Sequence, residues 1–278
     1  MKYCFSGHES FQCKSIWLKK GYDFINEGYK FTDNDAVVKL GVGKNMVASI
    51  RFWLKSFRLT INDELTNIAH YLFDSEKGKD PFTEDIGTLW LLHFILITEN
   101  VASIYKLVFL DFQREKKEYD RQQLQFFIKR KCNILEQKNV YNENTVKKDI
   151  RVLFQSYIHP STINSFEDFT GLFLPLNLIR EVRHDVYAFN EIKEEKINKL
   201  LIFFMLRYMN CNDKTISFDR IQDMALILCI PLPDFLLLLR DLANEYPMDL
   251  VYSDNSGIRN VQFLKDIDMF DILDKYYK

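Results

Sequence analysis

The chain contains few residues that make tight turns. Its 278 residues include nine glycines and six prolines, against 24 phenylalanines and 14 tyrosines. Few turn formers and many bulky side chains favour helices joined by short loops over a sandwich of many strands. The length allows one large domain or two to three small ones, each with its own core. Hydrophobic residues make up 47% and charged residues 27%, as is typical of a soluble globular protein.

The cysteines and the apolar segments predict a protein that lies in a reducing compartment and does not span a membrane. The chain has five cysteines, and none of them form a C-x-x-C pair, so neither a zinc site nor a disulfide framework is indicated. The N-terminus has no apolar stretch of signal-peptide length. The longest apolar run, residues 86–97, is about half of what a bilayer requires. We therefore expect a cytoplasmic protein with buried thiols and no membrane partner.

A helix, a glycine turn and a second helix follow one another near the N-terminus. Residues 32–35 (TDND) are typical of a helix start, with Thr32 as the cap and Asp35 placed for a capping box. Residues 41–43 (GVG) supply a tight turn. Residues 44–57 repeat their apolar side chains at steps of three and four, which predicts an amphipathic helix. This order is that of a helix-turn-helix unit, and residues 59–73 would form its wing or a further short helix.

Two later segments repeat this design around an apolar helix predicted at 85–98. In the first, Asp120 caps a helix, Asn142 or Asn144 caps the next, and strands follow near 178–182 and 186–189. In the second, residues 193–264 contain three helices and a hairpin around Asn255-Ser256-Gly257, before a terminal helix. The predicted fold is mainly α with small β wings, built of tandem winged-helix-like (helix-turn-helix) units around buried central helices. The expected units are 1–110, 111–190 and 191–278.

Positive charge is concentrated in two segments of an otherwise acidic chain. Residues 1–60 hold ten Lys/Arg against five Asp/Glu, and residues 121–158 hold eight against three, although the whole chain carries −2. Residues 61–120 and 159–278 are acidic, with six against twelve and thirteen against nineteen. Two basic islands of this kind are what local contacts with phosphate groups require.

The two islands supply the candidate DNA-binding residues. On the predicted helix 44–57 the basic side chains recur at helical spacing, and lysines at such positions contact phosphate while Asn, Ser and Arg can reach base edges. The alternative is an ordinary solvated helix face. The predicted double-stranded DNA contacts are Lys44, Asn45, Ser49, Arg51, Lys55, Lys147, Lys148 and Arg151. The corresponding helix of the third unit is leucine-rich with only Arg240 basic, which favours contact with protein.

The N-terminal string FSGHESF, residues 5–11, offers the only weak catalytic candidates. His8 and Glu9 could act as general base and orienting group, or bind a divalent ion such as Mg²⁺ or Mn²⁺. Neighbouring residues point apart, however, and a segment docked by Phe5 and Phe11 is the plainer interpretation. No cofactor is firmly indicated. Gly43-Lys44 is not part of a phosphate-binding loop for ATP, because Val38 and Asn45 stand where glycine and Ser or Thr are needed.

Several sequence blocks together resemble the bacterial domain-of-unknown-function 4007 (DUF4007) family. They begin with FSGHESF, WLKKGYDF and DAVVKLGVGKNMVASIRFW, and continue through DPFTEDIGTLWLLHFIL, ENTVKKDIRVLFQSYI and LVYSDNSGIRNVQF to DILDKYY. The similarity covers the full length. The resemblance implies an SspB-like component of an Ssp DNA phosphorothioation system used in phage defence. Its partners there would be an ATPase and a sulfur-transfer enzyme that resembles PAPS reductases, and SspB is described as a DNA-nicking protein.

Three functions follow as expectations. The first is a DNA-binding component of a phosphorothioation-type modification system that nicks one strand or presents it. The second is a protein-interaction scaffold that recruits the ATPase and the sulfur-transfer enzyme without DNA chemistry of its own. The third is a metal-dependent nickase with His8 and Glu9 near the broken bond. No family active-site motif is carried over to this chain, so the resemblance assigns no catalytic residue.

Overall fold

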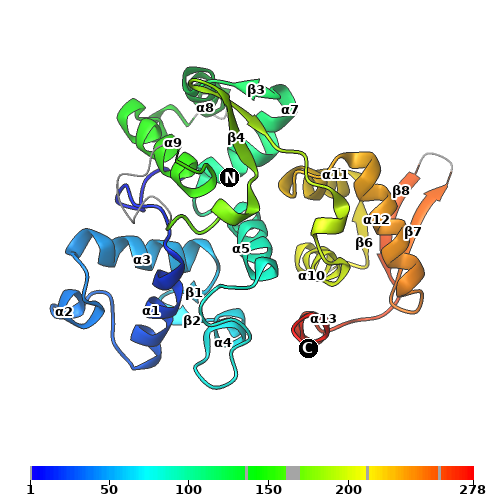
Figure 1. Ribbon diagram of the computed structural model, residues 1–278, viewed down its shortest axis with the longest axis horizontal. Coiled ribbons are helices and arrows are strands. Elements are labelled where there is room, and N and C mark those ends of the chain that lie inside the picture. Colours follow the sequence, from blue (N-terminus) through cyan, green and yellow to red (C-terminus); the bar gives the residue numbers. More distant parts are fainter. Residues whose placement is uncertain (1, 135–136, 161–169, 211–212, 256–257) are drawn as a thin grey trace. The chain divides into compact units, whose positions relative to one another are not determined.

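The chain folds into two compact units, residues 1–190 and 191–278 (Figure 1). The computed structural model describes all residues except 1, 135–136, 161–169, 211–212 and 256–257. The start of the second unit coincides with the expected start of the third sequence unit. The expected boundary after residue 110 falls inside the π-helix η1 (Leu107–Phe112), so residues on both sides of it belong to one compact body.

The N-terminal part of unit 1 is a small helical cluster followed by a hairpin. Phe24, Ala36, Leu40 and Val47 form its core and come from three successive helices. Gly41 ends the second helix in the left-handed conformation, at φ +62°, which glycine adopts without strain. The elements are α1 (Ser15–Asn26), α2 (Ala36–Leu40), α3 (Lys44–Ser56), β1 (Thr60–Ile61), β2 (Glu64–Leu65) and α4 (Asn67–Phe73).

One detail of this part differs from the prediction. The residue that precedes α2 is Asp35 rather than Thr32, and its side chain makes no capping hydrogen bond. The carboxylate of Asp33 instead accepts from the backbone N–H of Lys30 at 2.9 Å. The TDND sequence therefore forms a turn that leads into a very short helix, because Asp and Asn side chains stabilise turns as readily as helix starts.

The central helix α5 (Ile86–Glu99) is buried on nearly all sides, as the sequence predicted. Asp85 caps it by accepting from the backbone N–H groups of Gly87 and Thr88. The chain then bends through α6 (Ser103–Lys106), η1 and α7 (Gln113–Glu115). Among the described helices no single one is long and apolar enough to cross a bilayer. The segments Ile86–Glu99 and Ser103–Glu115 meet that requirement only as a pair, with a 97° bend between them.

The C-terminal part of unit 1 contains a helix pair and a three-stranded antiparallel sheet. Asn142 caps the second helix by accepting from the backbone N–H of Thr145 at 3.0 Å. The strand order is β3-β5-β4. The elements are β3 (Glu118–Tyr119), α8 (Arg121–Ile134), η2 (Lys138–Val140), α9 (Glu143–Tyr157), η4 (Leu174–Leu176), β4 (Ile179–Arg183) and β5 (Val186–Phe189).

Unit 2 repeats the same order of elements. A helix is followed by a strand, two helices and two strands, and the strand order β6-β8-β7 matches that of the sheet in unit 1. Residues 256–257 of the predicted hairpin turn lie outside the described residues, but both strands pair as expected. The elements are η5 (Glu194–Lys196), α10 (Lys199–Met209), β6 (Thr215–Ser217), α11 (Phe218–Ile227), α12 (Leu232–Glu245), β7 (Leu250–Asn255), β8 (Ile258–Phe263) and α13 (Met269–Tyr276).

The structure therefore confirms a mainly helical fold with small antiparallel sheets. In each of the three places a pair of helices precedes a hairpin: α2–α3 before β1–β2, α8–α9 before β4–β5, and α11–α12 before β7–β8. The second helix of each pair is an amphipathic helix of at least 13 residues. Whether these units act as winged helices is a question of what their exposed faces bind.

Candidate nucleic-acid interface

Helix α3 exposes most of the side chains that the sequence assigned to DNA contact. Lys44, Asn45 and Lys55 are exposed, and neither lysine forms an ion pair with any described residue. Arg51 is also exposed, but its guanidinium is held by Asp63, with Nε 2.8 Å from Oδ1 and Nη2 2.5 Å from Oδ2. The hydrogen bond with Asp63 raises the pKa of Arg51. Two of the three basic side chains predicted on α3, those of Lys44 and Lys55, are therefore free to meet an anion.

Ser49 does not belong to this exposed face, which corrects the prediction. Its side chain is fully buried, and its hydroxyl donates to the backbone carbonyl of His8 at 3.0 Å. Ser49 follows Val47 and precedes Ile50 on the inward side of α3, so the N-terminal segment covers it. A serine hydroxyl used in this way cannot contact a base edge.

A groove of about 840 Å³ runs beside the exposed face of α3. Lys44, Arg51 and Lys55 line it together with the turn of the β1–β2 hairpin. In that turn both Asn62 and Asp63 have left-handed backbones, at φ 52° and 66°, as two-residue hairpins require. Because Asp63 lies in this turn, its ion pair with Arg51 ties the hairpin to the helix.

Helix α9 presents the second basic face. Lys148 and Arg151 are exposed and have no ion-pair partner among the residues that the structure describes. Lys147 is exposed as well, but Glu143, one turn earlier, accepts from its ammonium group at 2.7 Å. The inward positions are those that the amphipathic pattern predicted: Val146, Ile150, Leu153 and Tyr157 are all buried.

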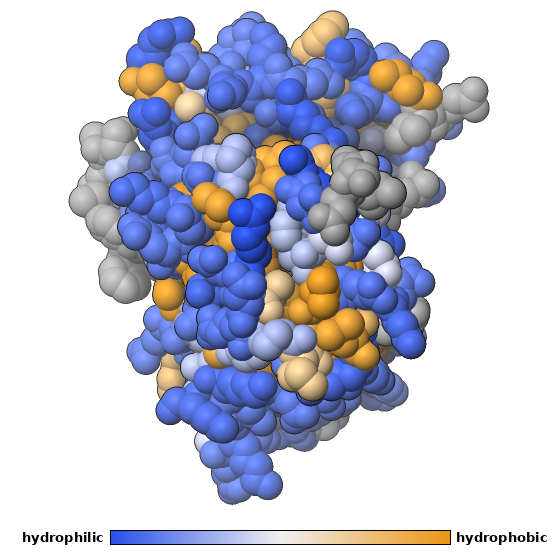
Figure 2. All heavy atoms as spheres, turned by 90° about the vertical axis from the view of Figure 1, so that its right-hand side faces the viewer, coloured by the Kyte–Doolittle hydropathy of each residue, from blue (hydrophilic) through white to orange (hydrophobic). Residues whose placement is uncertain are grey.

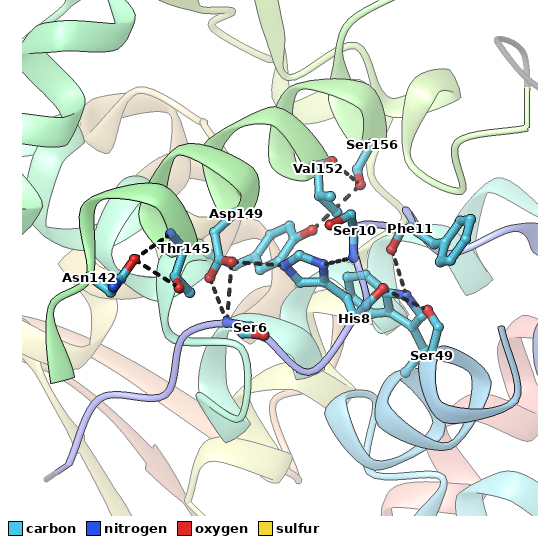
Figure 3. Close-up of polar contacts among 12 residues, drawn as sticks. Ser6, His8, Ser10, Phe11, Ser49, Asn142, Thr145, Asp149, Val152 and Ser156 are labelled. Carbon is cyan, nitrogen blue, oxygen red and sulfur yellow. Dashed lines mark hydrogen bonds and ion pairs between the residues drawn. The ribbon is translucent and has the colours of Figure 1, made fainter. Parts of the chain in front are cut away.

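The N-terminal segment lies between α3 and α9 and is fixed by a buried polar contact (Figure 3). His8 is only 3% exposed, and its Nε2 lies 3.0 Å from Oδ1 of Asp149 on α9. The backbone N–H of Ser10 donates to Nδ1 of the same ring at 3.1 Å, which assigns the ring proton to Nε2. The backbone N–H of Ser6 also donates to Asp149, at 3.0 and 3.2 Å from its two oxygens.

The backbone of this segment has an unusual conformation that only these contacts explain. Ser6, Gly7, Glu9 and Ser10 all have positive φ, between 47° and 101°. A Cβ at Gly7 would overlap the ring of Phe52 on α3, so glycine is required there for space as well as for conformation. On the α3 side, Trp53 stacks on His8 with ring centroids 6.2 Å apart and donates to the carbonyl of Phe11. The segment therefore joins the two basic helices.

The same geometry decides what His8 and Glu9 do. His8 points into the protein toward Asp149, whereas Glu9 is exposed, so the two side chains do not meet at one point. Within the described residues, no three His, Cys, Asp or Glu side chains come close enough to hold a metal ion. His8 and Glu9 therefore do not act together as a pair of ligands for Mg²⁺ or Mn²⁺.

The remaining reactive group of this segment is the Cys4 thiol. Burial raises its pKa, Asp149 raises it further, and Lys55 opposes the rise. A thiol with a raised pKa stays protonated at neutral pH and is a weak nucleophile. The site is therefore suited to holding a polyanion, and its buried polar groups position the two helices.

Sequence reasoning missed Asp149. The signal was present, because Asp149 falls three residues after Val146 and directly before Ile150, on the inward side of an amphipathic helix. A carboxylate at such a position must find donors, since an unpaired buried charge is costly. Its basic neighbours lie on the opposite, exposed face of the helix: Lys147, Lys148 and Arg151.

We predict that Asp149→Asn weakens the fold of unit 1. In either orientation the NH₂ group of the new amide faces an N–H donor. At the Oδ1 position it faces the Nε2–H of His8, and at the Oδ2 position it faces the backbone N–H of Ser6. One buried donor is left unsatisfied, which costs about 1–3 kcal/mol. Urea unfolding would show a lower midpoint, whereas Glu9→Gln, on the exposed neighbour, should shift the free energy of unfolding by less than about 0.5 kcal/mol. Equal midpoints for the two variants would contradict the role of Asp149.

We also predict that Gly7→Ala destabilises the protein for two separable reasons. The methyl group overlaps Phe52, and φ of +101° is strained for any L side chain. Strain of this kind costs on the order of 1–3 kcal/mol. In Gly7→Ala/Phe52→Ala the overlap is removed but the strain remains, so the loss should be smaller than the two single losses added together. Strict additivity in thermal or urea unfolding would show that the two residues do not touch.

Comparisons with known proteins agree with this architecture. Two crystal structures have the same fold, one of SspB with a bound magnesium ion and one of SspB, with TM-scores of 0.83 and 0.82. Each is 25% identical to this chain, and the match covers 98% of this chain and 87% of the other. No curated protein sequence matches. The model of the DUF4007 family, described as a protein of unknown function, matches residues 5–277, and the chain therefore belongs to this family.

Proposed function

We propose that this protein is the DNA-binding component of an Ssp-type DNA modification system. One observation supports this most directly: α3 and α9 each expose basic side chains that no described residue neutralises, and a single rigid segment connects the two helices. Lys44 and Lys55 lie on α3, and Lys148 and Arg151 lie on α9. Unpaired cations on a surface can neutralise DNA phosphates and so release their counterions, and this release is the main source of affinity for the DNA backbone.

The arrangement of the elements supports the same proposal. A second helix followed by a hairpin is the order found in winged helices, in which that helix enters a groove and the hairpin contacts the flanking backbone. The groove beside α3 lies between such a helix and such a hairpin. Asn45, at the exposed start of α3, is placed to contact a base edge, while the lysines contact phosphate.

The likeness to SspB supports the system in which this binding would operate. In our proposal the chain holds double-stranded DNA while an ATPase and a PAPS-reductase-like sulfur-transfer enzyme act on it. Strand nicking by the chain itself has less support, because His8 is buried and bonded to Asp149. The positions that carry DNA contact are Lys44, Asn45, Lys55, Lys148 and Arg151, with smaller contributions from the ion-paired Arg51 and Lys147.

We predict that Lys44→Gln/Lys55→Gln lowers the affinity for a 20-base-pair duplex and flattens its salt dependence. Each lost phosphate contact should reduce the slope of log K against log salt by about 0.9. The measurement is fluorescence anisotropy across a salt series. The matched control is Lys77→Gln/Lys117→Gln, which removes the same charge from two exposed lysines outside the groove. Equal slopes for the two double variants would overturn the role of α3.

A protein-interaction scaffold is the second candidate, and unit 2 favours it. On α12 Arg240 is the one basic residue, and it shares the carboxylate of Asp254 with Arg259, so α12 presents fewer cations than α3 or α9. Apolar side chains are exposed on α12 and around the sheet, with Leu237 at 52%, Met248 at 77% and Val251 at 41%. Figure 2 shows that hydrophobic side chains gather in small patches on a mostly hydrophilic face of the molecule.

We predict that Leu237→Asp/Val251→Asp abolishes co-purification with the ATPase or the sulfur-transfer enzyme in DNase-treated lysate if the scaffold function holds. The two positions are exposed, but aspartate has a low propensity for helix and strand, so the free energy of unfolding should fall by only about 1–2 kcal/mol. Duplex binding should be unaffected. Retention of both partners by this variant would remove the support that unit 2 gives to the scaffold.

A further inference from the structure

A second cavity, of about 460 Å³, adjoins the N-terminal segment, and of the positions proposed for contact with a duplex only Arg151 lines it. Ser10 and Phe11 of that segment form one wall, and α9 and the β4–β5 sheet form the others. Lys14, Arg121 and Arg151 line it against a single carboxylate, that of Glu181. Asp185 pairs with Arg121 from outside the lining, and the lining still carries an excess of positive charge that suits an anion.

Arg121 is held in a fixed orientation at this cavity. Its guanidinium carbon lies 5.5 Å from the ring centroid of Phe154 and 5.6 Å from that of Tyr187. Its Nη2 donates to the hydroxyl of Tyr187 at 2.8 Å, and its Nε lies 3.3 Å from Asp185. A cation fixed in this way loses less side-chain entropy when an anion binds, so its contribution to affinity is larger.

The size and the aromatic lining indicate what kind of anion fits. Cavities of about 300–1,000 Å³ hold small organic ligands rather than isolated ions. Phe11, Phe154 and Tyr187 border the cavity beside the cations. Phe154 and Tyr187 are only 5% and 3% exposed and face Arg121, so the half-buried Phe11 is the ring that is open to a base. Aromatic side chains next to basic ones are the combination that binds unpaired nucleotides, because each base can stack while its phosphate meets a cation. A nucleotide inside a duplex could not enter, since its base is stacked and paired.

We propose that this cavity binds one phosphate-bearing nucleotide of an unpaired DNA strand. Arg121 and Arg151 contact the phosphate, Lys14 adds positive charge, and the ring of Phe11 accepts the base. Glu181 opposes the phosphate and limits the affinity. The proposal rests on the proposed DNA-binding function and shares only Arg151 with it, so the groove beside α3 and the cavity beside α9 would hold paired and unpaired parts of the same DNA.

The test measures binding of a fluorescent ten-residue oligothymidylate and of a 20-base-pair duplex to the full chain. Arg151→Gln should weaken binding of the single strand on the order of fivefold and reduce its salt slope by about 0.7. Glu181→Gln should strengthen it by a similar factor, an effect that a purely structural role of either residue would not produce. Lys77→Gln is the matched control for loss of one exposed charge and should change neither probe more than about twofold.

The outcomes separate this inference from the proposed function. Lys44→Gln/Lys55→Gln should weaken duplex binding and leave the single strand within about twofold. Loss of duplex binding alone in that variant would therefore support a nucleotide site in the cavity that is separate from the groove. Unchanged single-strand binding in both Arg151→Gln and Glu181→Gln would overturn the proposed nucleotide site. Failure of the unchanged protein to bind the oligothymidylate at low salt would overturn it as well.

Competition distinguishes a strand from a free nucleotide. Thymidine monophosphate should displace the oligothymidylate at high concentration, while thymidine should not, because the phosphate supplies most of the interaction. Equal competition by thymidine would show that the cations do not contact the phosphate and would contradict the proposal. If the monophosphate binds as tightly as the oligothymidylate, the ligand is a free nucleotide. That result would contradict the proposal that the cavity binds an unpaired DNA strand.

Discussion

The arrangement of unit 1 depends on one buried carboxylate. Asp149 accepts from the backbone of Ser6 and from the ring of His8, and it does so from the inward side of α9. A buried carboxylate without donors would be strongly unfavourable, so the N-terminal segment has to approach α9 closely and in a single conformation. That conformation includes positive φ at Ser6 and Gly7, which the hydrogen bonds stabilise and Gly7 tolerates.

From this contact the two basic helices gain a fixed relation. The N-terminal segment that contacts Asp149 also packs against α3. There Ser49 and Trp53 donate hydrogen bonds to its carbonyl groups, and Phe52 packs on Gly7. The exposed lysines of α3 and the exposed cations of α9 thus lie on two helices that both contact the N-terminal segment. Rigid placement of several cations increases affinity for a polyanion, since little ordering remains to be done on binding.

The two units use the same order of elements for different surfaces. In both, a strand pairs with the last of two later strands, and an amphipathic helix precedes the hairpin. The outward side of α9 carries Lys148 and Arg151 with no described partner, whereas that of α12 carries Leu237 and an arginine close to Asp254. The same order of elements therefore carries exposed cations in one unit and exposed apolar side chains in the other, which is the basis of the two functions that we propose.

The sequence by itself determined the helices, their caps and the faces they bury. Asp120, and Asn142 of the two candidates 142 and 144, accept from backbone N–H groups at the start of the helices they were expected to cap. The inward residues of α9 are those of its apolar period, because these features depend on neighbours within one or two turns. Tertiary structure alone decided which polar residues of the site are accessible. Ser49 and Asp149 lie on basic helices but are covered by a segment more than 40 residues away in the chain, and Arg51 meets Asp63 only because a hairpin turn returns to the helix. Contacts between distant segments leave no period in the sequence, so no local pattern could have revealed them.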